Sequence, residues 1–221
     1  MHSQENNPIK IFIIGLPRTG TTSISVAMLE AGFKVAHTAF TKQTFELAQV
    51  ISDAPCFSDF EQLDRLYPNS KFIYLQRDLL KWIPSMQRLL TKMADDLNIK
   101  TGTFSPVLKR AFNECFDTEH NDLLSKQHLT QCYLNHEQHV LNYFKDRHDL
   151  LKINISHKDS YQQLCEFLNL SFQENQQFPH LNVGAQVAVW KNYKHKNKVS
   201  SHSSGKDHRQ FFAYKTGRMI E

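Results

Sequence analysis

The sequence predicts an α/β fold, in which a central parallel sheet carries helices on both faces, with an additional helical insert. Short apolar runs alternate with longer segments of helical periodicity along the 221 residues, which is the pattern of strands joined by crossover helices. Hydrophobic residues make up 40% of the chain, enough for one sizeable core, so we expect residues 1–221 to form a single domain. The four predicted strands are residues 9–14, 33–36, 71–75 and 150–155.

The first strand is continuously apolar and ends at Gly15, as a strand buried inside a parallel sheet does. A helix is predicted for residues 20–31, because apolar residues recur there at helical spacing and Gly32 provides a stop. After the second strand, apolar spacing predicts another helix over residues 41–51.

Residues 53–57 are predicted to be a short strand or an extended turn, because the residue before Pro55 is disfavoured in helices. Ser58 and Glu61 have the spacing of a capping box. They predict a helix that ends near Tyr67.

The second half of the chain is predicted to be mostly helical. A helix over residues 79–94 contains Pro84, which removes a backbone donor and predicts a kink or a restart. Residues 106–116 and 122–147 are predicted helices within a helical insert that spans residues 95–147.

Two further segments complete the predicted domain. Asp159 is expected to cap an amphipathic helix. Residues 191–221 form a basic C-terminal tail, which either is solvated or covers a bound anion. The first seven residues are polar and no apolar run reaches the ~20 residues of a membrane span, so a cytoplasmic protein with no membrane span is expected.

The net charge of +4 and the pI near 8.8 suit an anionic ligand but fall short of a nucleic-acid-binding signature. We therefore expect no nucleic-acid partner. The 12 histidines show no metal-ligand spacing. The four cysteines lie far apart and are expected to be reduced thiols: Cys56, Cys115, Cys132 and Cys165.

The chemistry of the sequence is concentrated in residues 15–22, Gly-Leu-Pro-Arg-Thr-Gly-Thr-Thr. The two glycines have the spacing of a nucleotide P-loop, which predicts a P-loop NTPase-like fold with an anion site at a helix N-terminus. Thr21 occupies the position of the P-loop lysine, and the cation is Arg18 instead. The alternative is that Arg18 is a solvated loop residue and the threonines are simple helix caps.

This loop resembles that of the sulfotransferase family, whose members move a sulfuryl group from 3′-phosphoadenosine 5′-phosphosulfate (PAPS) to a hydroxyl or amine acceptor. The resemblance implies no metal requirement and a small-molecule or carbohydrate acceptor. It also implies that the 5′-phosphosulfate is bound by Pro17, Arg18, Thr19, Gly20, Thr21 and Thr22.

A second motif of the family binds the 3′-phosphate through an arginine at a strand end and a serine eight residues later. Arg77 and Ser85 have this spacing. A late Phe-Pro-His-x-Asn element of one family branch is present at residues 178–182, so the resemblance extends over about residues 9–182.

Transfer needs a base near the acceptor proton and a cation on the leaving phosphate. Arg18 is the expected cation. By position in the family pattern Asp53 is the first candidate for the base, although a carboxylate of ordinary acidity is a weak base at neutral pH. His37 is the second candidate, because imidazole titrates in the right range.

Two other functions remain open at this point. A nucleotide kinase of similar fold would need the missing loop lysine and an acidic magnesium ligand. A non-catalytic protein that binds PAPS or another anion is the second alternative. The acceptor pocket is expected to be built from residues 38–52 and 95–147, whose composition suits a sugar, phenol, lipid or peptide.

Overall fold

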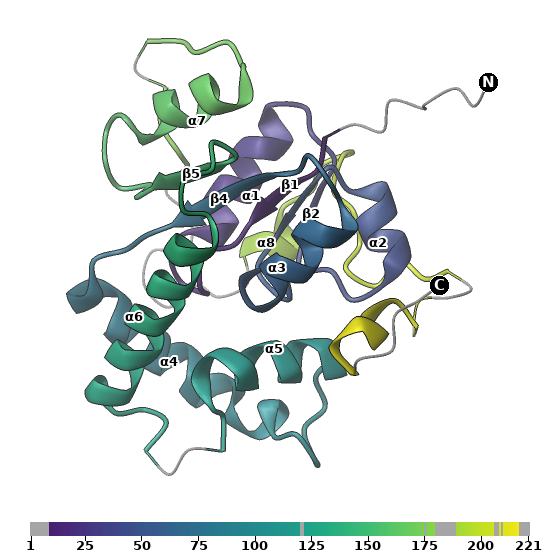
Figure 1. The fold of residues 1–221 in the computed structure, drawn as a ribbon, viewed down its shortest axis with the longest axis vertical. Helices are drawn as coiled ribbons and strands as arrows, with labels where there is room; N and C mark the ends of the chain where they lie inside the picture. The colour runs from purple at the N-terminus through teal and green to yellow at the C-terminus, as the bar shows by residue number, and fades with distance from the viewer. Residues whose placement is uncertain are drawn as a thin grey trace.

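Five parallel strands form the centre of the computed structural model, in the order β2-β3-β1-β4-β5 (Figure 1). The structure describes residues 9–119, 122–174, 176–179, 189–205, 208 and 210–216. The strands are β1 (Ile11–Ile13), β2 (Val35–His37), β3 (Val50–Ser52), β4 (Lys71–Leu75) and β5 (Leu150–Ile153). The helices are α1 (Thr21–Glu30), α2 (Lys42–Leu47), α3 (Cys56–Leu66), α4 (Leu79–Leu97), α5 (Pro106–Phe116), α6 (Lys126–Tyr143), α7 (Ser160–Leu168), α8 (Val189–Asn192) and the 3-10 helix η1 (Phe211–Thr216).

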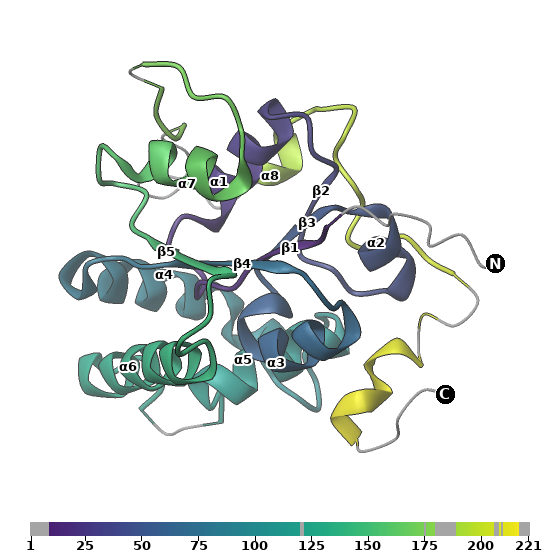
Figure 2. The same ribbon diagram turned by 45° about the horizontal axis from the view of Figure 1, so that its top comes forward.

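The sheet separates two layers of helices (Figure 2). Helices α1 and α7 cover one face, where Ile13 and Val50 are buried. Helices α3 and α6 cover the other face, where Phe12 and Ile51 are buried. Successive side chains of a strand point to opposite faces, so a continuously apolar strand supplies both cores. The predicted α/β fold with a central parallel sheet is confirmed.

A third core lies between α4, α5 and α6, beside the two cores of the sheet. Trp82, Phe112 and Leu129 are at most 2% exposed within it. This packing fixes α4 against the sheet. Helix α4 begins four residues after β4 ends, so its first turns lie near the carboxyl edge of the sheet.

The predicted helix over residues 41–51 is wrong in its second half. Helix α2 ends at Leu47, and β3 follows at Val50–Ser52, a strand that the sequence prediction missed. Tertiary pairing outweighs the local apolar spacing here, because β3 pairs with both β1 and β2 inside the sheet. The sheet consequently has five strands rather than four.

The predicted capping box is also wrong. Helix α3 begins at Cys56, so residues 53–57 are a turn that leads directly into a helix rather than an extended segment. The Ser58 hydroxyl lies 3.0 Å from the Pro55 carbonyl oxygen and 2.7 Å from Asp59 Oδ1, and does not cap a helix start.

The predicted helices of the second half are confirmed with adjusted ends. Residues 106–116 agree with α5, and α6 is shorter than the predicted 122–147. Helix α4 is one continuous element through Pro84, so the expected restart does not occur. None of the helices in the described part of the chain is both long and apolar enough to cross a membrane.

The described part of the C-terminal segment packs along the edge of the sheet instead of extending into solvent. Val35 of β2 donates its N–H to the Asn197 carbonyl at 3.0 Å and accepts from the Val199 N–H at 2.8 Å. Phe40 N–H donates to the Ser201 carbonyl at 2.9 Å. The edge strand β2 is therefore covered, which removes an open pairing edge.

Candidate active site

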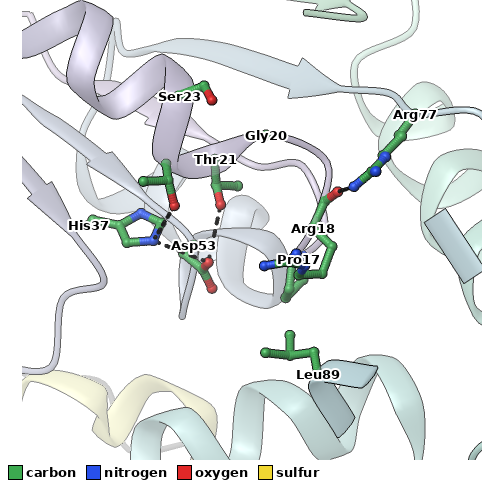
Figure 3. Close-up of a pocket in the computed structure, with 10 residues that line it drawn as sticks. Pro17, Arg18, Gly20, Thr21, Ser23, His37, Asp53, Arg77 and Leu89 are labelled. Carbon is green, nitrogen blue, oxygen red and sulfur yellow. Dashed lines mark hydrogen bonds and ion pairs between the residues drawn. The ribbon is translucent and has the colours of Figure 1, made fainter. Parts of the chain in front are cut away.

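A cavity of about 120 Å³ lies at the carboxyl edge of the sheet (Figure 3). The segments that follow β1, β3 and β4 meet there with the last residue of β2 and with α4. This is the edge at which open parallel sheets bind their ligands. The cavity is lined by Pro17, Arg18, Gly20, Thr21, Thr22, Ser23, His37, Asp53, Arg77 and Leu89.

The loop between β1 and α1 needs its two glycines. A Cβ on Gly15 would lie 2.6 Å from Leu75 Cβ and 2.9 Å from Leu75 N, so a side chain there would collide with β4. Gly20 has φ +112°, a conformation that L side chains rarely adopt, and a Cβ there would lie 2.2 Å from Ile155 Cδ1. The close packing keeps the loop directly over the sheet edge.

Side-chain hydrogen bonds hold the loop from within and from α4. The Thr19 hydroxyl donates to the Leu16 carbonyl at 2.6 Å, and Trp82 Nε1 donates to the Pro17 carbonyl at 2.9 Å. Arg18 has φ 70°, in the left-handed region. The buried Thr19 thus stabilises the turn, whereas Arg18 faces the cavity.

The two predicted phosphate motifs are joined by hydrogen bonds. Arg18 Nε donates to the Ser85 hydroxyl at 2.9 Å. Arg77 Nη1 donates to the Arg18 carbonyl at 2.6 Å, as Figure 3 shows. The backbone of Arg77 is itself held by Tyr133, whose hydroxyl accepts from Arg77 N–H at 2.9 Å and donates to its carbonyl at 3.0 Å. Helix α6 therefore orients the second arginine.

Positive charge is in excess around the cavity. Burial and the charges of Arg77 and Arg88 lower the pKa of Arg18, although Asp53 opposes that shift. Burial and the charge of Arg88 likewise lower the pKa of Arg77. None of the ion pairs in the described part of the chain includes these three arginines. Such an arrangement favours a bound anion, which relieves the mutual repulsion.

The two candidate bases face each other in the cavity. His37 Nε2 lies 3.7 Å from Asp53 Oδ2, and both side chains are 14% exposed (Figure 3). The first two residues of α1 contact this pair. The Thr21 hydroxyl donates to Asp53 Oδ2 at 3.3 Å, and the Thr22 hydroxyl lies 3.4 Å from His37 Nε2.

Burial makes His37 a neutral imidazole. Desolvation lowers the pKa of His37, and the nearby Lys198 lowers it further, while Asp53 raises it to a lesser extent than burial lowers it. Asp53 has φ 61°, and its Oδ1 accepts from Ala54 N–H at 2.9 Å. This hydrogen bond leaves Oδ2 directed at Thr21 and His37.

Most of the predicted site residues come together at the cavity. Ser85 does not line it but contacts Arg18, and Thr19 is buried in the turn. The element at residues 178–182 lies outside the described residues except for Phe178 and Pro179. The Phe178 ring packs 5.0 Å from the Tyr161 ring in a core. The described part of the 178–182 element therefore packs against α7 and does not reach the cavity lining.

Sequence reasoning missed several residues at the site. Arg88 and Leu89 follow Ser85 at helical spacings of three and four, so the face of α4 that carries Ser85 could have revealed them. Ser23 also lines the cavity. Ser25 and Ser52 are buried behind His37, and their contacts with that ring could not be predicted because they depend on β3, which the sequence prediction missed.

Two further expectations concern metal binding and the state of the cysteines. Within the described ranges, no group of three or more His, Cys, Asp or Glu side chains is arranged to hold a metal ion. All four cysteines are free thiols. Burial raises the pKa of Cys56 well above its ordinary value, with contributions from Asp59 and Asp53.

Comparison with known families gives a match. The sequence model of the sulfotransferase domain matches residues 39–187, which is more than half of the 221 residues. A search of curated proteins found no match. The matched segment contains Asp53, Arg77 and Ser85, and it begins after the loop at residues 15–22. The chain belongs to the sulfotransferase domain family.

Proposed function

We propose that the protein is a PAPS-dependent sulfotransferase that acts on a hydroxyl or amine acceptor. The observation that carries the proposal is the cavity itself, in which arginines that form no ion pair with a described residue lie opposite the His37–Asp53 pair. Anion binding and proton acceptance are the two tasks that sulfuryl transfer sets. The bound donor supplies the sulfuryl group.

The donor set suits a nucleotide with phosphate groups at both ends of one ribose. The loop residues Pro17 to Thr22 and the N-terminus of α1 would hold the 5′-phosphosulfate. Arg77 and Ser85 would hold the 3′-phosphate. Arg18 bonds to Ser85 through Nε only, so its terminal nitrogens are available to neutralise charge on the leaving phosphate.

We propose that His37 accepts the proton of the acceptor group and that the negative charge of Asp53 supports it. The neutral His37 ring can accept a proton at Nε2, the atom nearest the Asp53 carboxylate. Asp53 then stabilises the imidazolium by its charge across that short distance. The two candidates therefore act as a pair rather than as alternatives.

The presence of Thr22 and Asp53 in one cavity favours a second candidate function. In nucleotide-hydrolysing P-loop proteins, magnesium is held by a loop threonine or serine together with an aspartate from a strand end. Asp53 follows a strand end, and Thr22 stands at the position of that loop threonine, although the hydroxyl that contacts Asp53 is that of Thr21. A kinase-like phosphotransferase that uses Mg-ATP is thus the alternative, with the missing loop lysine against it. A non-catalytic anion-binding protein is the third possibility.

We propose a small-molecule or carbohydrate acceptor without narrowing its class. Leu89 is the one large apolar side chain among the residues that line the described cavity. Polar side chains therefore dominate beside His37 and Asp53. The cytoplasmic location and the independence from metal also stay predictions.

The direct test is turnover. The protein is incubated with PAPS and a panel of phenol, sugar, lipid-alcohol and amine acceptors, with EDTA present, and released adenosine 3′,5′-bisphosphate is quantified. Acceptor-dependent release is expected, with kcat reduced at least tenfold in His37→Gln and in Asp53→Asn. Release no faster than without protein across the panel contradicts the proposal. Magnesium-dependent loss of the ATP γ-phosphate would favour the kinase alternative.

A further inference from the structure

The His37 ring is the end of a chain of buried hydrogen bonds that reaches into α1. His37 Nδ1 lies 2.7 Å from the Ser52 hydroxyl, and that oxygen lies 2.8 Å from the Ser25 hydroxyl. The Ser25 hydroxyl lies 2.6 Å from the Thr21 carbonyl. Ser25 and Ser52 are both 0% exposed, so water does not compete for these contacts.

The fold brings these three side chains together by register. His37 and Ser52 are direct partners in the parallel ladder of β2 and β3, and both are the last residue of their strand. Alternation along the strands turns both toward the face that α1 covers. Ser25 lies one helical turn after Thr21 on α1, which packs on β2 and β3.

Only one assignment of protons makes all three hydrogen bonds at once. The Thr21 carbonyl can only accept, so the Ser25 hydroxyl donates to it. Ser25 has no second proton, so the Ser52 hydroxyl donates to Ser25. The Ser52 proton is then committed, so His37 Nδ1 must carry a proton and donate it to Ser52.

We propose that Ser25 and Ser52 are positioning residues that hold His37 in its Nδ1–H tautomer, with the lone pair of Nε2 directed into the cavity. Nε2 is the atom beside Asp53 and the Thr22 hydroxyl, so the basic nitrogen is the one that an acceptor group can reach. A carboxylate usually orients a catalytic histidine through its second nitrogen. In this protein a serine pair performs that task, and Asp53 lies on the reactive side. The inference rests on the role proposed for His37.

The test reads the tautomer directly in the free protein. Long-range 1H–15N NMR spectra of protein labelled with 15N-histidine distinguish a protonated Nδ1 from a protonated Nε2, and His37→Gln assigns the signals. The Nδ1–H form is expected in the wild type at neutral pH. A wild-type Nε2–H form overturns the proposal.

The variant Ser25→Ala removes the acceptor of the Ser52 proton, which can then turn toward His37 Nδ1. The Nε2–H form is expected to become the major one, with kcat for sulfuryl transfer reduced at least tenfold. Ser70→Ala is the matched control, because Ser70 is 2% exposed and also donates to a backbone carbonyl, that of Tyr67. An unchanged tautomer in Ser25→Ala overturns the proposal.

The same spectra separate this inference from the proposed function. A tautomer change in Ser25→Ala with normal turnover supports the serine pair and contradicts the role of His37 as the base. Loss of turnover in Ser25→Ala with the tautomer unchanged overturns the serine pair and leaves the proposed sulfotransferase standing. Ser52→Ala is a second test of the tautomer, because it removes the hydroxyl that accepts the hydrogen bond from His37 Nδ1–H.

Discussion

At the scale of single residues, burial controls the protonation of two histidines. His37 and His136 both have a lowered pKa, with desolvation as the largest cause. For His136 the pKa falls to about 4, although a hydrogen bond with the Phe57 carbonyl opposes the shift. Both rings are therefore neutral at physiological pH: His37 at the site and His136 in the core.

His136 makes the stability of the fold depend on pH. Above pH ~6.5 the ring is neutral in both folded and unfolded chains and contributes no pH dependence. Between pH ~6.5 and the folded pKa of about 4 only the unfolded chain binds the proton, so stability falls as the pH falls. The loss from this residue should reach about 3 kcal/mol near pH 4 and then level off.

Urea unfolding of wild type and His136→Gln at several pH values checks this. The variant should lose less stability on acidification than the wild type. The control is His148→Gln, at an exposed histidine that follows α6. Equal acid sensitivity in wild type and His136→Gln contradicts the assignment.

At the scale of elements, close packing holds the loop between β1 and α1 in place at the sheet edge. Gly20 and Gly32 flank α1, and both have positive φ, +112° and +92°. A Cβ on Gly20 meets Ile155, whereas a Cβ on Gly32 meets nothing within 4 Å. An alanine would therefore strain the backbone at either position, but its side chain would collide with a neighbour only at Gly20.

This difference predicts unequal effects of the same substitution. Gly32→Ala should cost about 1 kcal/mol of stability, from the left-handed backbone alone. Gly20→Ala should cost more and should also weaken anion binding, because the loop must move away from Ile155. The double variant Gly20→Ala with Ile155→Val should recover part of the loss, since valine lacks the Cδ1 atom at 2.2 Å. Thermal unfolding of the four proteins measures this, and equal losses in both single variants would count against the steric explanation.

The elements also show what sequence could predict. Strong local signals placed β1, α1, β4 and α5, because apolar runs, glycine stops and an N-terminal proline act within a few residues. Strand β3 has three residues, and its formation depends on pairing with β1 and β2. Local spacing could not reveal it.

The site residues also divide into those that local sequence predicts and those that depend on strand pairing. Arg18, Arg77 and Asp53 follow strands and could be predicted from spacing and resemblance. The contact between His37 and Ser52 arises from the register of two strands that are 15 residues apart along the chain, and no sequence pattern marks it. Arg88 could have been found, because it lies three residues after Ser85 on one helix and therefore on the same face.

At the scale of the whole molecule, a buried carboxylate ties the C-terminal segment to the domain. Asp59 of α3 is 0% exposed and accepts two hydrogen bonds from Arg110 of α5, at 2.8 and 2.7 Å. It also accepts from the Tyr214 hydroxyl at 2.7 Å and lies 3.4 Å from Lys215 Nζ. Burial alone would raise the pKa of Asp59, but Arg110, with help from Lys215 and Tyr214, keeps it below the ordinary value.

Asp59→Asn should therefore destabilise the protein by about 3 kcal/mol, because it removes the buried counter-charge of Arg110 and leaves it with Glu114, which is 36% exposed. Limited trypsin digestion should also cut earlier near Lys215, since the segment loses a partner. Asp149→Asn is the control, because its side chain and that of its partner Arg147 are each 32% exposed and such pairs contribute about 1 kcal/mol or less. A destabilisation of Asp59→Asn no larger than that of the control contradicts this account.

The central claim is that the cavity binds a nucleotide with phosphates at its 5′ and 3′ positions, without a metal. Calorimetric titration with adenosine 3′,5′-bisphosphate in EDTA, and separately with ATP and magnesium, tests it most directly. The wild type should bind the bisphosphate in EDTA and prefer it to Mg-ATP. Arg77→Ala should bind it at least tenfold more weakly, the equivalent of about 1.4 kcal/mol. Arg65→Ala, at an exposed arginine of α3, should bind it unchanged. A preference for Mg-ATP, or bisphosphate affinity that Arg77→Ala leaves intact, would contradict the claim.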